Sequence, residues 1–258
     1  MVDIHSHIIP SIDDGAKSLE ETMEMLENAA KDGTRKIFAT PHYCIDYGDE
    51  HYKEVVKKVK EIGEEVEKKN INIKIYPGQE VYYSGRLLED LKEGVIGTLN
   101  ETRYMLIEFN MRHLEEEVFE ILYELKIGGI VPIVAHPERY TYLQKHPSLI
   151  NKFIDEGCLF QLNGGSTLGM HGRETEETAK LFIEKGIYSF IGSDAHSTRY
   201  RKTGIKKALE KVYEINKELG QEIELNGERL ILNELIYFNG VRVEKRKKKK
   251  GIFSFFNR

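Results

Sequence analysis

Two histidines near the start of the chain have the spacing of a metal site. His5 and His7 follow a short apolar stretch and are separated by Ser6. Residues i and i+2 of a β-strand point to the same face, so both imidazoles would lie together at the end of such a strand. Imidazole nitrogens bind zinc, iron and other transition metals. The alternative is a pair of surface histidines, and the rest of the chain decides between the two interpretations.

Further histidines and carboxylates recur at equivalent positions along the chain. Each comes at the carboxyl end of a predicted strand, and they are His42, Glu80, Glu108, His136, Asp194 and His196, with Asp14 close by in the first loop. Together with His5 and His7 these residues exceed the need of one ion and suit two or three ions that share a bridging carboxylate. Because the set contains no thiolate, it favours manganese, iron or zinc over copper(I) or an iron–sulfur cluster.

The remaining histidines provide a contrast. They fall in loop or helix-flanking sequence, where we predict surface positions, and they are His51, His113, His146 and His171. A single carboxylate after a strand is frequently only a helix cap, and a single histidine there is frequently a turn residue. The concentration of the other histidines at strand ends therefore indicates a shared site.

The two cysteines, Cys44 and Cys158, are predicted to be inert. A cysteine-based phosphatase loop, C-x5-R, requires arginine six residues after the cysteine, and those positions hold Glu50 and Gly164. Two cysteines also make no disulfide framework, which favours a reducing compartment.

The elements that would position these side chains alternate between strand and helix. Apolar runs predict strands over residues 36–40, 71–76, 104–109, 130–135, 158–162 and 188–193, after a short first strand. Helical periodicity predicts intervening helices, among them 52–69 and 114–126, and a long helix after residue 205. Ser18 and Glu21 have the pattern of a capping box. Residues 221–244 are expected to form an end piece with turns at Asn226-Gly227 and Asn239-Gly240.

About seven such strand–helix units predict a parallel sheet closed into a distorted seven-stranded (β/α)7 barrel. Active sites of α/β barrels lie at the carboxyl ends of the strands, where the candidate ligands fall. An open doubly wound sheet is the alternative, although no G-x-G-x-x-G follows the first strand. A length of 258 residues with 40% hydrophobic and 31% charged residues suits one such α/β domain.

Charge is distributed unevenly along the chain. The formal net charge is −5, while residues 245–250 read Lys-Arg-Lys-Lys-Lys-Lys, so the body is more acidic than the total. An acidic body argues against a nucleic-acid partner. No apolar run approaches the ~18 residues of a membrane span, and we expect no signal peptide. These features predict a cytoplasmic protein.

Five segments together resemble the PHP (polymerase and histidinol phosphatase) superfamily. They are Asp3-Ile4-His5-Ser6-His7, Thr40-Pro41-His42, Pro77-Gly78-Gln79-Glu80, His136-Pro137-Glu138-Arg139 and Ser193-Asp194-Ala195-His196. The chain is most similar to the bacterial manganese-dependent protein tyrosine phosphatases of the CpsB/YwqE type. The resemblance covers residues 1–240, which we take as the domain, and it implies the PHP fold and a three-ion metal site.

The resemblance also implies a role for each candidate ligand. By position, the first ion would be held by His5, His7, Glu80 and Asp194, the second by Glu80, Glu108 and His136, and the third by Asp14, His42 and His196. Asp13 is an alternative to Asp14. Arg139 and Arg201 match the phosphate-binding arginines of the family, with Arg199 as an alternative to Arg201.

The activity implied is hydrolysis of protein phosphotyrosine, dependent on Mn²⁺ with iron or zinc as alternatives. A metal-bridging hydroxide would attack phosphorus, and the arginine forks would stabilise the charge that develops on the phosphate. The implied partner is a membrane-associated bacterial tyrosine kinase that controls capsule or exopolysaccharide synthesis. The alternatives are a histidinol-phosphatase-like enzyme for small phosphomonoesters and a catalytically idle, metal-stabilised docking module.

The C-terminal tail, residues 241–258, falls outside the resemblance. Its basic run is followed by Gly-Ile-Phe-Ser-Phe-Phe at residues 251–256. Basic residues beside aromatic ones bind anionic membrane surfaces, at roughly 1 kcal/mol per charge near the surface. Peripheral contact with the inner face of the cell membrane is therefore one hypothesis for the tail, and a solubilising end is the other.

Overall fold

The strands form two parallel sheets. The computed structural model describes residues 1–44 and 48–245. One sheet has the order β1-β2-β4, with β1 at Val2–Asp3, β2 at Lys36–Ala39 and β4 at Lys74–Pro77. The other is curled and has the order β3-β5-β6-β7-β8-β9, with β3 at His42–Tyr43, β5 at Glu80–Tyr82, β6 at Tyr104–Glu108, β7 at Val131–Ala135, β8 at Leu159–Asn163 and β9 at Phe190–Gly192.

The expectation of seven strands in one closed sheet was wrong, because the curled sheet has six strands in the part of the chain that the structure describes. Two of the expected strands, β2 and β4, are each followed after a short break by a further strand that belongs to the other sheet. Pro41, which has no N–H to donate to a ladder, separates β2 from β3. Gly78 separates β4 from β5, and a Cβ there would meet Leu99 Cδ2 at 2.5 Å. After these breaks, β3 and β5 pair with the strands of the curled sheet, which forms a half-barrel.

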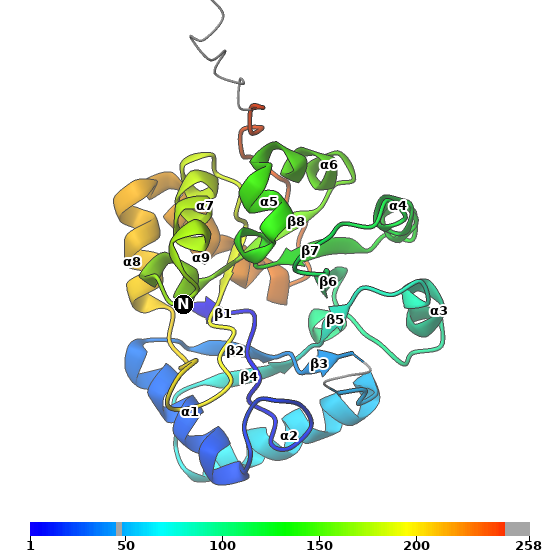
Figure 1. The fold of residues 1–258 in the computed structure, drawn as a ribbon. Helices are drawn as coiled ribbons and strands as arrows, with labels where there is room; N and C mark the ends of the chain where they lie inside the picture. Colours follow the sequence, from blue (N-terminus) through cyan, green and yellow to red (C-terminus); the bar gives the residue numbers. More distant parts are fainter. Residues whose placement is uncertain (45–47, 246–258) are drawn as a thin grey trace, which may run out of the picture.

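The segment after β1 joins the two sheets. The Ile4 amide donates to the Ile191 carbonyl at 3.3 Å, and the Asp194 amide donates to the His5 carbonyl at 2.8 Å. Figure 1 shows β1 between the two groups of strands. Residues from the start and from the end of the domain are thereby brought side by side.

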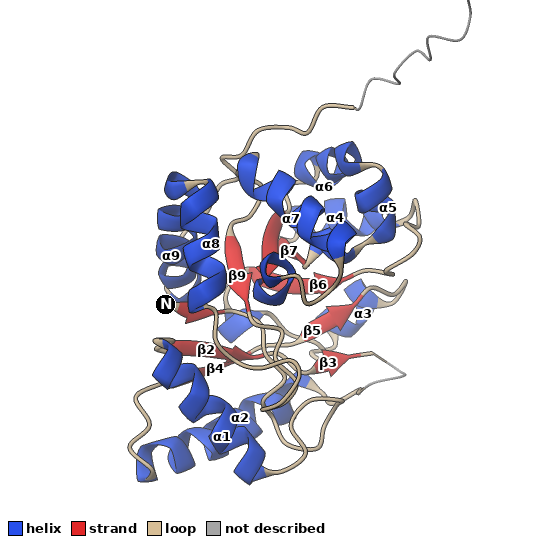
Figure 2. Ribbon diagram, turned by 60° about the vertical axis from the view of Figure 1, so that its left-hand side comes forward, coloured by secondary structure: helices blue, strands red, loops and turns tan. Residues whose placement is uncertain are grey.

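Helices cover the outer faces of both sheets (Figures 1 and 2). The three-stranded sheet packs against α1 (Leu19–Asp32) and α2 (Tyr52–Lys68). The curled sheet is accompanied by α3 (Leu87–Lys92), α4 (Val118–Ile127), α5 (Thr141–Lys145), α6 (Ile150–Asp155), α7 (Arg173–Glu184), α8 (Lys206–Ile215) and α9 (Lys217–Ile231). Short 3-10 turns occur at Leu99–Glu101, Pro137–Arg139, Pro147–Leu149 and Gly164–Leu168.

Helix α1 begins where its sequence predicts. Ser18 Oγ accepts a hydrogen bond from the Glu21 amide at 3.3 Å, as a capping residue does. The Glu21 carboxylate accepts a hydrogen bond from the Lys17 amide at 2.9 Å. In a standard capping box this carboxylate would accept from the amide of the N-cap residue, Ser18. Gly33 ends the helix with φ +102°, a conformation that favours glycine.

The end of the domain differs from the sequence expectation. The predicted long helix is two helices, α8 and α9, which meet at Asn216. The turn expected at Asn226-Gly227 was wrong, because both residues lie inside α9. Gly227 lets α9 approach β1 closely, since a Cβ at this position would meet Val2 Cβ at 2.7 Å.

The chain remains packed against the body after α9. Val243 is buried, and its amide and carbonyl both bond to the side chain of Asn151, at 3.0 and 2.9 Å. Most of the basic run and all of the aromatic stretch, residues 246–258, lie outside the described residues. Within the described ranges, no helix is long and apolar enough to cross a membrane.

Candidate metal centre

The candidate ligands lie where strands of both sheets end or begin. His5 and His7 follow β1, Glu108 ends β6, His136 follows β7, and Asp194 and His196 follow β9. His42 and Glu80 were expected after the carboxyl ends of their strands, but they are the first residues of β3 and β5. The interruptions after β2 and β4 therefore bring these two side chains to the same rim as the others.

The first group of candidate ligands consists of His5, His7, Glu80 and Asp194, and all four side chains are buried. Nε2 of His5 and Nε2 of His7 are 3.1 Å apart. Glu80 Oε2 lies 3.2 Å from the first nitrogen and 3.3 Å from the second. Asp194 Oδ1 lies 3.6 and 3.5 Å from the same two atoms. Two imidazole nitrogens that face each other among carboxylate oxygens fit a divalent cation.

Glu80 also belongs to a second group. His136 Nε2 lies 2.9 Å from Glu80 Oε1 and 3.6 Å from Glu108 Oε1. His42 Nδ1 lies 3.0 Å from Glu80 Oε2. Each oxygen of Glu80 thus faces different imidazoles, so this carboxylate would be able to hold more than one ion.

The third group surrounds Asp14. Asp14 Oδ1 lies 3.1 Å from His196 Nε2 and 3.7 Å from His42 Nε2, and His7 completes the group. Asp13 has another role, because it accepts hydrogen bonds from the Gly15 amide at 2.8 Å and the His42 amide at 3.1 Å and contacts His7 Nδ1 at 2.7 Å. This geometry supports Asp14 as the ligand and Asp13 as a residue that orients His7.

Two arginines face the same ligands. Arg139 Nη1 donates to Asp194 Oδ2 at 2.8 Å, and Arg201 forms an ion pair with Asp194 Oδ1. Both arginines line a cavity of about 560 Å³ together with several of the metal-binding candidates. We call this cavity the metal cleft. Arg199 is exposed and does not line it, which supports Arg201 as the phosphate-facing residue.

Strand β8 supplies two further polar side chains that contact the ligands. Gln161 Oε1 lies 3.0 Å from His5 Nδ1 and accepts from the His136 amide at 3.2 Å. Asn163 Nδ2 donates to Asp194 Oδ2 at 2.7 Å. Sequence reasoning assigned these residues no role. The one available indication in the sequence was that Gln161 and Asn163 are polar residues in an otherwise apolar strand.

The comparisons with known proteins agree with this geometry. Residues 1–233 match the family model described as "Capsular polysaccharide synthesis, CpsB/CapC". The chain belongs to this CpsB/CapC family. It is 33% identical to tyrosine-protein phosphatase YwqE of Bacillus subtilis, over 98% of this chain and all of the relative. It is also 33% identical to the putative tyrosine-protein phosphatase CapC of Staphylococcus aureus, over 92% of this chain and 93% of the relative.

A solved structure of the CpsB/CapC family has the same fold. It comes from a study of YwqE from Bacillus subtilis and CpsB from Streptococcus pneumoniae, described as metal-dependent tyrosine phosphatases. It superposes with a TM-score of 0.90 at 30% identity and covers 95% of this chain and all of that chain. The family and the α/β fold predicted from the sequence are therefore confirmed.

Burial and neighbouring charges shift the pKa values of several candidate ligands in this site of the CpsB/CapC family member. Burial would raise the pKa of Glu80, but the imidazoles of His5 and His42 hold it well below its usual range. Burial and the nearby charge of Glu80 raise the pKa of Glu108 well above the usual value. Burial and the guanidinium of Arg139 lower the pKa of His136 to about 4, so this imidazole is neutral and able to bind metal at neutral pH.

His171 is not the surface residue that its loop position predicted. Its side chain is partly buried, and burial together with the charge of Arg139 lowers its pKa to about 4. Its Nε2 would lie 3.3 Å from a Cβ at Gly165, in the turn that follows β8. The glycine-rich sequence around His171 indicates only a turn. It does not show that this histidine folds back toward Arg139 and Arg201.

Cys158 lacks the surroundings of a nucleophile, and neither cysteine belongs to a C-x5-R loop. Cys158 is fully buried in the main apolar core, and burial raises the pKa of its thiol. Cys44 is partly buried at the edge of the metal cleft and forms no disulfide. Together with the missing C-x5-R arginines, these surroundings point to chemistry at the metal ligands rather than at a thiolate.

Proposed function

We propose that this protein hydrolyses phosphotyrosine in a protein substrate, with manganese held by the three ligand groups. The observation that carries the proposal is the convergence of nine histidines and carboxylates, with two arginines, on one cleft. The names of the relatives support phosphotyrosine as the substrate. Histidine and carboxylate ligands suit manganese, and iron or zinc would bind the same set.

The bound ions would supply Lewis acidity and a water of lowered pKa. The protein's own contribution is to hold the phosphate and to balance its charge. The side chains of Arg139 and Arg201 line the metal cleft, and both guanidinium groups contact Asp194. Planar guanidinium groups match phosphate oxygens in pairs, so these arginines would bind the ester and stabilise the charge of the transition state.

The walls of the metal cleft provide room for the tyrosine ring. Tyr82 and Met111 line it beside the ligands, and both offer apolar surface to an aromatic group. Since the phenol of tyrosine has a pKa near 10, its departure needs less proton donation than that of an alkyl alcohol. A protonated histidine or a bound metal would help the phenolate leave, and this help matters less than it would for a serine ester.

Relatives in capsular polysaccharide synthesis indicate the physiological setting. We infer that the substrate is a membrane-associated bacterial tyrosine kinase that controls capsule or exopolysaccharide production. The protein would then act in the cytoplasm, at the inner face of the membrane. The basic and aromatic tail would hold it there, and deletion of residues 245–258 should reduce its sedimentation with vesicles of anionic lipid. Unchanged sedimentation would contradict this role of the tail.

The test of the function compares two substrates and two histidine variants. Metal-stripped protein is assayed with a phosphotyrosine peptide and with histidinol phosphate, before and after addition of Mn²⁺. We expect Mn²⁺-dependent turnover of the peptide that His136→Ala abolishes. His113→Ala, which changes an exposed histidine, should retain it. Preference for histidinol phosphate would favour a small-molecule phosphatase, and no turnover of either ester would favour a docking module.

A further inference from the structure

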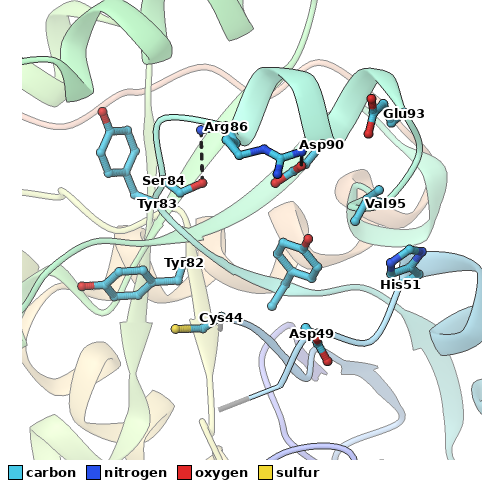
Figure 3. Close-up of a pocket in the computed structure, with 11 residues that line it drawn as sticks. Cys44, Asp49, His51, Tyr82, Tyr83, Ser84, Arg86, Asp90, Glu93 and Val95 are labelled. Carbon is cyan, nitrogen blue, oxygen red and sulfur yellow. Dashed lines mark hydrogen bonds and ion pairs between the residues drawn. The ribbon is translucent and has the colours of Figure 1, made fainter. Parts of the chain in front are cut away.

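A second cavity opens directly beside the metal cleft. Its volume is about 570 Å³, and it shares Cys44 and Tyr82 with the metal cleft (Figure 3). Its described walls come from β3 and the segment just before α2, from the end of β5 and the residues after it, and from α3 with the turn after it. Consecutive residues of a peptide are less than 4 Å apart, so a peptide bound at the metal cleft would place neighbouring side chains in this second cavity.

The two cavities lie on opposite sides of one short strand. In β3, His42 belongs to the ligand groups, and the next side chain, Tyr43, lines the second cavity. This follows from the alternation of side chains along a strand. Tyr82 and Tyr83, at the end of β5, add two further rings to the lining. The second cavity is therefore aromatic on the side nearest the metal cleft.

Carboxylates predominate among the charged residues of this cavity. Among the residues that the structure describes, it is lined by Asp49, Asp90 and Glu93 and by a single guanidinium, that of Arg86. Arg86 is already engaged, because its Nη2 lies 3.4 Å from Asp90 Oδ1 and its Nε lies 3.2 Å from Glu89 Oε2 (Figure 3 shows the contact with Asp90).

The remaining carboxylates are available to a ligand. Within residues 1–44 and 48–245, Asp49 and Glu93 have no ion-pair partner, and both are exposed. Tyr43 lines the same cavity as Asp49 and Asp90, so its ring lies among carboxylates. A cation placed over such a ring is attracted by the aromatic face and by the carboxylates around it.

The charge of the second cavity is opposite to that of the phosphate-facing residues. Arg139 and Arg201 face the anionic ester in the metal cleft, whereas the second cavity repels anions. We propose that the second cavity binds a lysine or arginine side chain located within a few residues of the substrate's phosphotyrosine. This inference rests on the proposed phosphotyrosine activity and adds a sequence preference to it.

The test scans a basic residue through phosphotyrosine peptides. Heptapeptides carry lysine, glutamine or glutamate at one position from −3 to +3 around the phosphotyrosine, and KM and kcat are measured with Mn²⁺. At one or two positions lysine should lower KM about three- to tenfold relative to glutamine, with kcat little changed. Glutamate at the same positions should raise KM. A simple aryl phosphate, which does not extend beyond the metal cleft, serves as the reference substrate.

Variants of the cavity separate this preference from catalysis. The double variant Asp49→Asn, Glu93→Gln should lose the preference for lysine and retain its turnover of the aryl phosphate. The control Glu61→Gln, Glu64→Gln removes two exposed charges from α2 and should retain the preference. Peptide hydrolysis with equal KM for lysine and glutamine at every position would overturn the inference alone. Failure to hydrolyse any peptide would overturn the proposed function as well.

Discussion

Gln161 Oε1 lies 3.0 Å from Nδ1 of His5, and both side chains are fully buried. This contact fixes Nδ1 as the proton-bearing nitrogen, because an amide oxygen only accepts hydrogen bonds. The other nitrogen, Nε2, then faces His7 and Glu80 with its lone pair free for a metal. Gln161, which is not itself a candidate ligand, would thus determine which atom of His5 is free to bind an ion.

Replacing Gln161 should weaken metal binding before it affects the fold. Gln161→Leu keeps the approximate volume but removes the acceptor, so we expect about 10- to 100-fold weaker binding of Mn²⁺. Isothermal titration of metal-stripped protein measures this directly. In Gln161→Glu the acceptor is restored, and binding should recover in part. Equal affinity in the wild type and in Gln161→Leu would show that the contact does not orient His5.

Arg201 should be more important for turnover than its near neighbour Arg199. Arg201→Lys keeps the charge and loses the paired donors, so kcat for a phosphotyrosine peptide should fall about 10²- to 10³-fold. Arg199→Lys, at an exposed position outside the metal cleft, should change kcat less than twofold. Steady-state kinetics at saturating Mn²⁺ distinguishes the two. A large loss of kcat in Arg199→Lys but not in Arg201→Lys would show that Arg199, rather than Arg201, binds the phosphate.

Glu138 should make stability fall as pH rises. Burial raises the pKa of this carboxyl to about 7, and its oxygens accept from the Asn163 amide at 3.0 Å and the Tyr188 hydroxyl at 2.9 Å. A raised pKa means that the folded protein holds the proton longer than the unfolded chain, so stability is lost between pH 4.5 and about 7. The loss is on the order of 2 kcal/mol between pH 5 and pH 8.

The control for this pH effect is Glu138→Gln, which stays neutral at every pH. Urea unfolding of both proteins at pH 5 and pH 8 gives the difference between their pH dependences. The variant should lose less stability than the wild type over this interval. Parallel losses in the two proteins would assign the pH dependence to other groups.

Two glycines in helices should respond oppositely to alanine. Gly227→Ala places a Cβ 2.7 Å from Val2 Cβ, and such overpacking should cost about 1–3 kcal/mol of unfolding free energy. Gly63→Ala in α2 meets no atom within 4 Å and should gain about 0.5–1 kcal/mol from helix propensity. Thermal or urea unfolding provides both values. A stabilised Gly227→Ala would contradict the close approach of α9 to β1.

The sequence was most informative where chemistry requires particular residue types. Short motifs predict His5, His7 and Asp194 as candidate metal ligands, and the structure brings the three side chains together. The strand interruptions were less visible, since Gly78 is required by contact with Leu99, which is distant in the chain. The helical position of Gly227 likewise depends on Val2, at the other end of the domain.

The sequence did not predict the residues that hydrogen-bond to the candidate ligands and orient them. Gln161 and Asn163 belong to a strand whose sequence indicates only burial, and the fold alone brings them to His5 and Asp194. His171 was placed at the surface because its flanking glycines suggest a loop. Its approach to Arg139 depends on how the turn after β8 folds back, which periodicity does not describe.

The most direct test of the account is a Mn²⁺ titration of metal-stripped protein that follows bound metal and phosphotyrosine-peptide turnover in the same samples. We predict that turnover is absent without metal and rises as ions occupy the three ligand groups, up to about three per chain. His136→Ala should bind fewer ions and remain inactive. Full turnover by the stripped protein, or occupied sites without any turnover, would contradict a metal-dependent phosphatase.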